Sequence, residues 1–498
     1  MVTAIGGQMA VGRGLRSRPA RRVRGYLSVH AEETRSLMAR STSTRGVRIV
    51  DRGRTVGPVA RLLLAGALVA CARIPGTDRT VQWTPAVSVS ASTGGGAAPV
   101  FATAPGGGVA LAWVAAPNGG TDGRLYVRLA DHHDSISELR DPLGGLSIYG
   151  EVPPKIAYAP DGMLYAAYIV TKVVPGERWA QNAMRFARSV DGGAHWSTPM
   201  TVTATARGDS VFGMYDDHAL LVASDGTIYI SWLGMVGDTS HTYIVHSTDR
   251  GTTWTRPAAI DAGASCPCCR TAMAAGPDGA LYVAWRKIYP GGPGQSEVRD
   301  MAVARSTDHG ATWSAPVRVH VDDWHVTYCP DAGPSIKVGA DGTVHIAWWT
   351  GKDGHAGVQY AQSTDRGATF STPVPLGIAK VSRAAHVQVA VGTGSFAGTV
   401  AAVWDDGTRA IPRIVARISR DGGRTFGDEE MLSGADDAAG YPVLSLRDGT
   451  LTVAWQQRSL EAAAQDSATQ ARMDPAAATT YIKSVGALRV VSRSGTLR

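Results

Sequence analysis

An eight-residue motif, Ser-x-Asp-x-Gly-x-x-Trp/Phe, occurs five times at nearly constant intervals, and it limits the possible folds more than any other feature of this chain. The copies begin at Ser189, Ser247, Ser306, Ser363 and Ser419. Their aspartates are 58, 59, 57 and 56 residues apart. A fixed period of this length indicates a repeat architecture, in which each repeat is one supersecondary unit that packs against its neighbours.

A second motif runs in step with the first: an apolar run, a Gly-containing turn, and an alternating strand that ends in Trp or Tyr. Its seven terminal aromatic residues are Trp113, Tyr168, Trp232, Trp285, Trp348, Trp404 and Trp455. Two-residue alternation between regularly spaced turns predicts antiparallel strands, four in each unit. Seven such units predict an all-β protein, a seven-bladed β-propeller that is nearly free of helix from residue 83 to about residue 458.

The two ends of the repeat region predict how the ring closes. Residues 81–90 resemble the outer strand that follows each motif copy, although no copy precedes them. The last unit, from Tyr441 onward, has no convincing outer strand of its own. We therefore expect the N-terminal strand to complete the last blade of a propeller spanning residues 83–490. Residues 459–478 lack a strand pattern and predict an irregular or briefly helical insertion in that blade.

The N-terminal region differs in composition from the rest of the chain. Residues 1–71 contain 13 Arg and 3 acidic residues, so the formal charge of +7 belongs to this leader and the remainder is mildly acidic. No nucleic-acid partner is expected for such a domain. Residues 1–55 lack periodicity and are interpreted as disordered or as an over-long gene start.

Residues 56–71 predict a secretory signal, whose apolar stretch is too short to span a bilayer. Its last four residues, 68–71, resemble a bacterial lipobox, in which Cys71 would become the lipidated first residue of the mature protein. The alternative is an ordinary signal peptide with a chance cysteine. We expect an extracytoplasmic lipoprotein, periplasmic or at the cell surface, held at the membrane by its lipid.

The segments before the innermost strands are the candidate functional region. The turns of both motifs close one face of the ring, so these segments gather at the channel mouth on the opposite face, where functional loops are expected. They are residues 151–154, 214–218, 266–270, 328–333, 381–386 and 440–442. Cys266, Cys268 and Cys269 lie in one segment and Cys329 in the equivalent segment of the next blade. We therefore expect the four thiols to lie close together.

Three interpretations of these cysteines remain open. An oxidising compartment favours a disulfide between Cys329 and one of the other three. Thiolates with a nearby histidine, His218, His325 or His386, would instead form a soft-metal site for Cu or Zn. The third interpretation is a reactive thiol, for which the sequence supplies no specific base. No other cofactor is expected.

The repeated motif is an Asp box, or BNR repeat, and the chain resembles the sialidase superfamily over roughly residues 83–490. In such boxes the carboxylate accepts backbone N–H bonds and the aromatic side chain packs between sheets, which is a structural role. The resemblance also implies an alternative fold of six blades, as in sialidases. In that family an arginine triad binds the substrate carboxylate, a Tyr assisted by a Glu is the nucleophile, and an Asp is the acid/base.

Part of this catalytic set can be carried over. Residues 438–455 resemble the final-blade stretch that bears the nucleophile, which makes Tyr441 the candidate. Arg270 and Arg383 lie at rim positions suited to binding a carboxylate. Asp217 and Asp331 share that rim and are the candidates for the acid/base. The chain departs from the family in its seven units, in its cysteine cluster, and in an Arg-Ile-Pro motif (73–75) that precedes no inner strand.

Three functions follow from these observations. The first is an exported sialidase-like propeller that binds a small-molecule or glycan ligand, or a soft metal, at the channel mouth. The metal ligands would come from Cys266, Cys268, Cys269, Cys329 and His218. The second is an exo-acting glycoside hydrolase of the exo-α-sialidase type, which cleaves terminal sialosides. The third is an extracytoplasmic scaffold for protein interactions.

Overall fold

The structure is a computed structural model that describes residues 81–116, 122–130, 135–148, 150–172, 181–202, 215–326, 328–378, 384–409, 411–460 and 488–497. All of them belong to one compact unit, Pro75–Arg498. The predicted signal peptide, Cys71 and Arg383 lie outside the described residues. No helix in the described ranges is long and apolar enough to cross a membrane.

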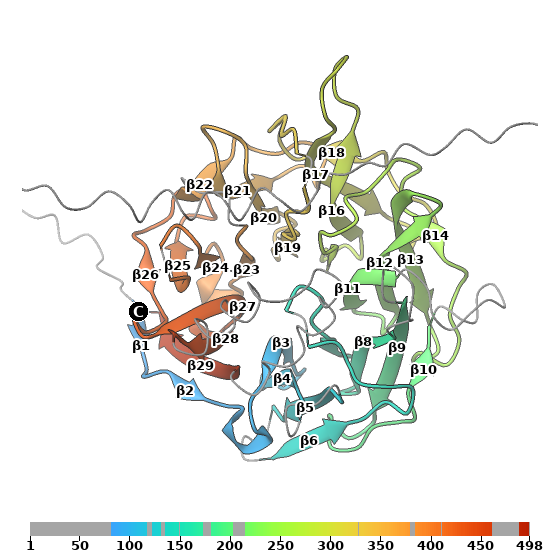
Figure 1. The fold of residues 1–498 in the computed structure, drawn as a ribbon, viewed down its shortest axis with the longest axis vertical. Coiled ribbons are helices and arrows are strands. Elements are labelled where there is room, and N and C mark those ends of the chain that lie inside the picture. The colour runs from blue at the N-terminus through green and yellow to red at the C-terminus, as the bar shows by residue number, and fades with distance from the viewer. Residues whose placement is uncertain are drawn as a thin grey trace, which may run out of the picture. The chain divides into compact units, whose positions relative to one another are not determined.

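Seven antiparallel sheets, or blades, are arranged around a central axis (Figure 1). In the first six, the strands follow one another from the axis outward in chain order. Blade one contains β3 (Ala97–Thr103), β4 (Val109–Ala115), β5 (Arg124–Arg128) and β6 (Ile136–Leu139), and blade two contains β7 (Lys155–Tyr158), β8 (Leu164–Lys172), β9 (Gln181–Ser189) and β10 (Met200–Thr201). Blade three contains β11 (Tyr215–Val222), β12 (Ile228–Val236), β13 (Thr239–Ser247) and β14 (Ala258–Ala259), and blade four contains β15 (Ala272–Ala275), β16 (Leu281–Tyr289), β17 (Val298–Ser306) and β18 (Val317–Arg318). Blade five contains β19 (Ser335–Val338), β20 (Val344–Thr350), β21 (Gly357–Ser363) and β22 (Val374–Ile378), and blade six contains β23 (Gln388–Val391), β24 (Val400–Asp406), β25 (Arg413–Ser419) and β26 (Glu430–Met431).

The innermost strands form a closed ring. Each one, from β3 through β7, β11, β15, β19 and β23 to β27 (Asp437–Arg447), contacts the next, and β27 contacts β3. The seven-bladed prediction is therefore confirmed, and the six-bladed alternative is wrong. Helix in the described residues is limited to Leu460 and to short 3₁₀ segments such as η1 (Ala91–Thr93) and η3 (Gly394–Phe396), which confirms the expected all-β character.

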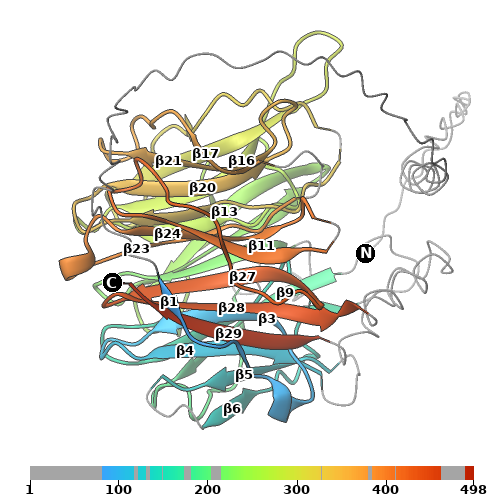
Figure 2. The same cartoon turned by 90° about the vertical axis from the view of Figure 1, so that its left-hand side faces the viewer.

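The seventh blade combines both ends of the propeller. Its strands β27, β28 (Thr450–Ser459) and β29 (Arg489–Thr496) are completed by β1 (Gln82–Trp83) and β2 (Val87–Ser88), which both pair with β29. Trp83 lies opposite Gly495 in this ladder. Figure 2 shows β1 along the same blade as β28 and β29. The predicted closure is confirmed, and the predicted insertion lies between β28 and β29, where residues 461–487 are outside the described ranges.

The repeated aromatic residues form the core between blades. Each of the seven terminal Trp or Tyr side chains lies on the second strand of its blade, and each is at most 2% exposed. A side chain of this size buries 150–250 Å² and dominates the energetics of a core. This placement explains why the aromatic residue recurs once per unit.

The Asp boxes are structural turns between the third and fourth strands. In the first box, the Ser189 hydroxyl donates to Asp191 Oδ1 at 2.6 Å and accepts from the Gly193 N–H at 2.8 Å. The box aromatic packs on the preceding blade, as in the edge-to-face contact of Trp254 with Phe186 at a centroid distance of 5.1 Å. These bonds leave the box aspartates occupied with backbone and neighbouring side chains, as the sequence predicted.

Candidate functional site

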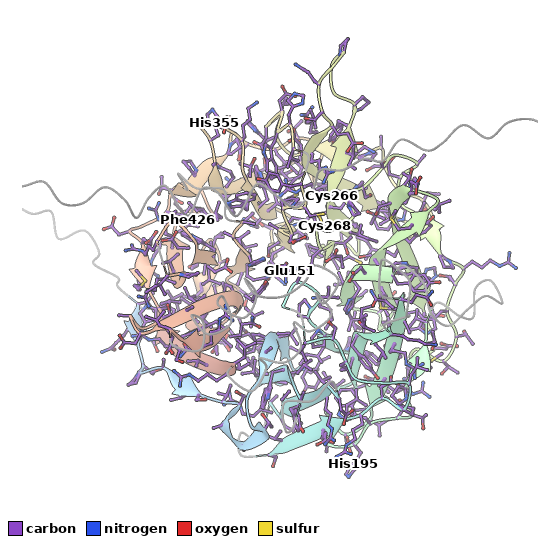
Figure 3. The ribbon with its side chains drawn as sticks, in the orientation of Figure 1. Glu151, His195, Cys266, Cys268, His355 and Phe426 are labelled. Atoms are coloured by element: carbon purple, nitrogen blue, oxygen red, sulfur yellow. The ribbon has the colours of Figure 1, made fainter. Side chains whose placement is uncertain are left out.

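The segments before the inner strands meet at the channel mouth opposite the Asp-box turns. In Figure 3, Glu151 lies near the centre of the ring, whereas His195 and Phe426 of two Asp boxes lie toward its outside. Two groups of side chains occupy this mouth. We call Glu151, His386, Asp405 and Tyr441 the acid–base cluster, and Cys266, Cys268, Cys269 and Cys329 the thiol cluster.

His386 is the centre of the acid–base cluster. Its Nδ1 pairs with Asp405 Oδ2 at 2.7 Å and its Nε2 with Glu151 Oε1 at 2.6 Å. Its backbone N–H also donates to Asp405 Oδ1 at 2.5 Å. Burial opposes protonation, but the two carboxylates prevail and raise the pKa of His386 to about 10. The imidazole is therefore a buried cation at neutral pH, and neither ring nitrogen is available to a metal ion.

Tyr441 is held against this imidazolium. The two rings stack with centroids 4.2 Å apart and planes 24° from parallel. The Tyr441 N–H donates to Asp405 Oδ2 at 3.3 Å. A Cβ at Gly150 would lie 2.7 Å from Tyr441 Cδ2, so the ring leaves room only for glycine at position 150. The candidate nucleophile of the sequence thus lies at the mouth, with its ring fixed by backbone, imidazole and glycine.

Four of the entering segments contain a non-glycine residue in the left-handed backbone region. These residues are Ala98, Asp217, Asp331 and Tyr441, with φ between 50° and 54°. Non-glycine residues with positive φ are uncommon, and they concentrate where the surrounding structure over-determines a functional geometry. Three of the four lie at register shifts in the inner strands β3, β11 and β27.

Asp217 is a buried carboxyl group beside this cluster. It is 4% exposed, and its Oδ1 has no hydrogen-bond partner among the described residues. Burial and the adjacent Asp216 carboxylate raise the pKa of Asp217 well above its usual range. Burial and the positive charge of Arg270 lower the pKa of Lys155, which has Asp217 and Glu151 nearby. Two sequence candidates, Asp217 and Arg270, therefore lie at one electrostatically coupled site.

The thiol cluster brings together the cysteines of two segments. Cys266 Sγ lies 3.3 Å from Cys269 Sγ and 3.6 Å from Cys268 Sγ. The ligand atoms of Cys268, Cys329 and Asp331 all lie within 4.8 Å of one another. This confirms the expectation that Cys329 lies beside the Cys266–Cys269 segment. All four are free cysteines in the structure.

Exposure increases across the cluster. Cys266 and Cys269 are at most 1% exposed, Cys268 is half-buried, and Cys329 is exposed. Hydrogen bonds from Cys268 and Cys269, together with Arg286 and Arg299, hold the pKa of the Cys266 thiol well below its usual range. A thiolate at the buried end is therefore stabilised by the structure.

Two arginines position the thiol cluster. Arg299 Nη1 donates to Cys266 Sγ at 3.6 Å and to the Tyr328 carbonyl at 3.2 Å. Arg286 is 1% exposed and donates to the Ala332 carbonyl at 3.0 Å. The two guanidinium groups therefore bind both cysteine segments and place positive charge beside the sulfurs.

Asp331 connects the two clusters. Its backbone carbonyl lies 3.2 Å from His386 Nε2, while its carboxylate belongs to a group with Cys268 and Cys329. Burial and the charge of Glu151 raise the pKa of Asp331 to about 7. The segment that contains Asp331 is therefore shared by the acid–base cluster and the thiol cluster.

The histidines proposed from the sequence lie elsewhere. His218 belongs to neither metal-type group among the described residues; its Nε2 contacts the Ala167 carbonyl at 3.1 Å, and burial lowers its pKa to about 3. His325 Nδ1 lies 2.8 Å from the Ser296 carbonyl. The sequence did not single out Glu151 or Asp405, although Glu151 lies in a segment that it identified.

A family comparison agrees with the repeat and the fold. Residues 146–325 match the BNR repeat-like domain. The match covers blades two to four of the seven-bladed propeller. No curated protein matches it.

Several solved structures are similar to this propeller. A Dyadobacter fermentans protein of unknown function is 18% identical, with a TM-score of 0.45 over 81% of this chain and 95% of that one. A Hadza microbial sialidase is 19% identical, with a TM-score of 0.43 over 72% and 78%. A polysaccharide lyase, an ulvan lyase, is 13% identical, with a TM-score of 0.47 over 75% and 91%.

The mouth of the propeller can support two kinds of chemistry. The thiol cluster offers soft sulfur ligands beside compensating positive charge. The acid–base cluster offers a tyrosine ring stacked on a fixed imidazolium, with the buried carboxyl group of Asp217 beside the cluster.

Proposed function

We propose that the propeller binds a soft metal ion, Cu(I) or Zn(II), through the thiol cluster at its channel mouth. The observation that carries this proposal is the close approach of three sulfurs. Cys266 Sγ lies 3.6 Å from Cys268 Sγ and 3.3 Å from Cys269 Sγ. A tetrahedral zinc thiolate centre with Zn–S bonds near 2.3 Å requires sulfur separations of roughly 3.8 Å. Small side-chain movements are enough to reach that geometry.

The surrounding charge favours an ion bound by thiolates. Metal binding deprotonates each thiol, so three sulfurs around one ion leave excess negative charge. Arg299 contacts Cys266 Sγ directly, and the buried Arg286 lies close to the same sulfur. Their positive charges offset the excess in an environment that excludes most water.

Elemental analysis tests this proposal. Protein purified without chelator, under reducing conditions, should carry copper or zinc, and Cys266→Ser should lose it. Ser265→Ala is the matched control, since Ser265 lies in the same segment and bonds Thr242 Oγ1 at 2.9 Å without contributing a thiol. A second preparation without reductant that is metal-free and gives fewer than four reactive thiols after denaturation would support a disulfide instead.

The proposal includes the location of the protein. The cationic leader, the short apolar stretch and the lipobox-like residues 68–71 support export and lipid attachment at Cys71. Labelling an expressing bacterium with an alkyne-tagged fatty acid should modify the wild type but not Cys71→Ser. Equal labelling of both proteins would refute the anchor.

A second candidate function is cleavage of a glycan by the acid–base cluster, as in an exo-acting glycoside hydrolase of the sialidase type. The observation that favours it is the fixed Tyr441 beside the imidazolium of His386, with the buried carboxyl group of Asp217 on the same rim. A fluorogenic sialoside assay tests this candidate. Turnover that Tyr441→Phe abolishes would support it, and absence of turnover by the wild type would exclude this substrate.

A further inference from the structure

We propose that the thiol cluster and Asp331 hold two metal ions, which share the Cys268 thiolate as a bridging ligand. This inference rests on the proposed function and adds the number of ions and the ligands of each. The ligand atoms form two groups, each with all its atoms within 4.8 Å. The inner group is Cys266, Cys268 and Cys269, and the outer group is Cys268, Cys329 and Asp331.

The arrangement of the sulfurs favours two ions over one. A single four-sulfur centre needs every sulfur pair at roughly 3.8 Å. Cys329 shares a group with Cys268 but not with Cys266 or Cys269. One ion would therefore leave a sulfur unused. A thiolate has lone pairs for two ions, and Cys268 is the residue that both groups contain.

The two groups differ in ligand type and exposure. The inner group has three sulfurs and no oxygen or nitrogen, and two of its cysteines are at most 1% exposed. Soft ligands of this kind select Cu(I). The outer group combines two sulfurs with a carboxylate, a set that suits Zn(II), and the exposed Cys329 leaves room for a fourth ligand from solvent. We therefore assign Cu(I) to the inner position and Zn(II) to the outer one.

Both positions are held in place by hydrogen bonds. Arg299 Nη1 contacts Cys266 Sγ and the Tyr328 carbonyl, so one side chain joins the inner group to the segment of the outer group. His386 binds the Asp331 carbonyl, and Arg286 binds that of Ala332. These contacts fix the distance between the two groups without any ion.

Metal stoichiometry tests the inference. The metal-free full chain would be loaded anaerobically with one equivalent of Cu(I) and then with Zn(II), desalted, and measured by native mass spectrometry and elemental analysis. We expect one copper and one zinc in the wild type. Cys329→Ser and Asp331→Asn should keep the copper and lose the zinc, whereas Cys266→Ser should lose the copper. Tyr328→Phe, an exposed neighbour outside both groups, should keep both ions.

The bridge has its own test in Cys268→Ser. This variant should lose the zinc and bind copper at least tenfold more weakly in a chelator competition, while its thermal melt and near-ultraviolet circular dichroism stay close to those of the wild type. Retention of both ions by this variant would overturn the bridge. A wild type that binds a single ion and needs all four cysteines would overturn the two-ion arrangement but keep the proposed function. A wild type that binds neither metal would refute both.

Discussion

Tyr441 stacks on His386 with ring centroids 4.2 Å apart, which places an aromatic face against a buried imidazolium. The positive charge is retained because Glu151 and Asp405 bind the two ring nitrogens. Glu151, His386 and Asp405 together join the segments that enter blades two and six to strand β24. Replacing His386 should therefore change the stability of the fold as well as the binding of any ligand.

The first prediction concerns His386→Gln. Without the imidazolium, two buried carboxylates lose their counter-charge, and removing one partner of a buried ion pair typically costs about 3–5 kcal/mol. The pKa of His386 is raised to about 10, above its unfolded value, so its stabilisation is complete below about pH 6.5 and disappears as the pH rises through 10. Urea unfolding at pH 6 and pH 10.5 should show a large difference between wild type and variant at pH 6 and a small one at pH 10.5. A difference that does not change with pH would contradict this charge assignment.

The second prediction concerns the Asp boxes. Hydrogen bonds from the Thr312 side chain and backbone and from Ser306 lower the pKa of Asp308 to about 2. A carboxyl group with a lowered pKa stabilises the fold above its unfolded pKa near 4, and the contribution is lost as the pH falls through 2. Asp308→Asn should therefore lower the melting temperature slightly at pH 6, by about 1–2 °C, and have almost no effect at pH 2. Melting curves at both pH values check this, with the solvent-exposed Asp448→Asn as a comparison that should be neutral at both.

The third prediction concerns the closing blade. A Cβ at Gly495 would lie 2.6 Å from the ring of Trp83 and would also overlap Val81. Gly495→Ala should therefore destabilise the propeller by about 1–3 kcal/mol, as expected for overpacking. Gly434→Ala is the control, because nothing lies within 4 Å of its Cβ position. Deletion of residues 81–90 should lower thermal stability much further, and an unchanged melting curve would contradict the role of β1 and β2 in closure.

The fourth prediction concerns metal removal. An ion that binds only the folded state adds about 2.7 kcal/mol of stability at a free concentration one hundred times its Kd. Chelation under reducing conditions should lower the melting temperature of the wild type and leave Cys266→Ser unchanged. Scanning calorimetry with and without chelator measures this. Equal shifts in both proteins would mean that the chelator acts elsewhere.

The sequence predicted the fold and the position of the thiols because both follow from repetition. Once Trp285 and Trp348 mark equivalent strands, the segments before β15 and β19 must enter neighbouring blades at the same height, which brings Cys268 close to Cys329. Pseudo-symmetry places a segment, but it does not orient side chains that depart from the repeat.

The sequence analysis did not identify Arg286 and Asp405, because the contacts of these side chains do not follow the repeat. Arg286 follows Trp285 at the end of an alternating strand and has the pattern of a surface position. It is buried because β16 extends to Tyr289 and the guanidinium reaches the Trp349 carbonyl of the next blade at 2.7 Å. Asp405 similarly follows Trp404 in β24, and its role depends on His386 from another segment. Contacts of this type depend on strand length and packing between blades, which local pattern does not encode.

The seventh blade combines strands from both ends of the propeller, and this determines when the ring can be completed during biosynthesis. Six blades are built from contiguous stretches of chain and can form in order as the polypeptide is made. The seventh needs β1 and β2 to find β29, whose last residue is Thr496. Until then, the strand edges of the two terminal blades lack their partners and are open to pairing with other chains. Final assembly of this propeller therefore waits until β29 has been made, and the interval before it is the period in which the nascent protein is most exposed to aggregation.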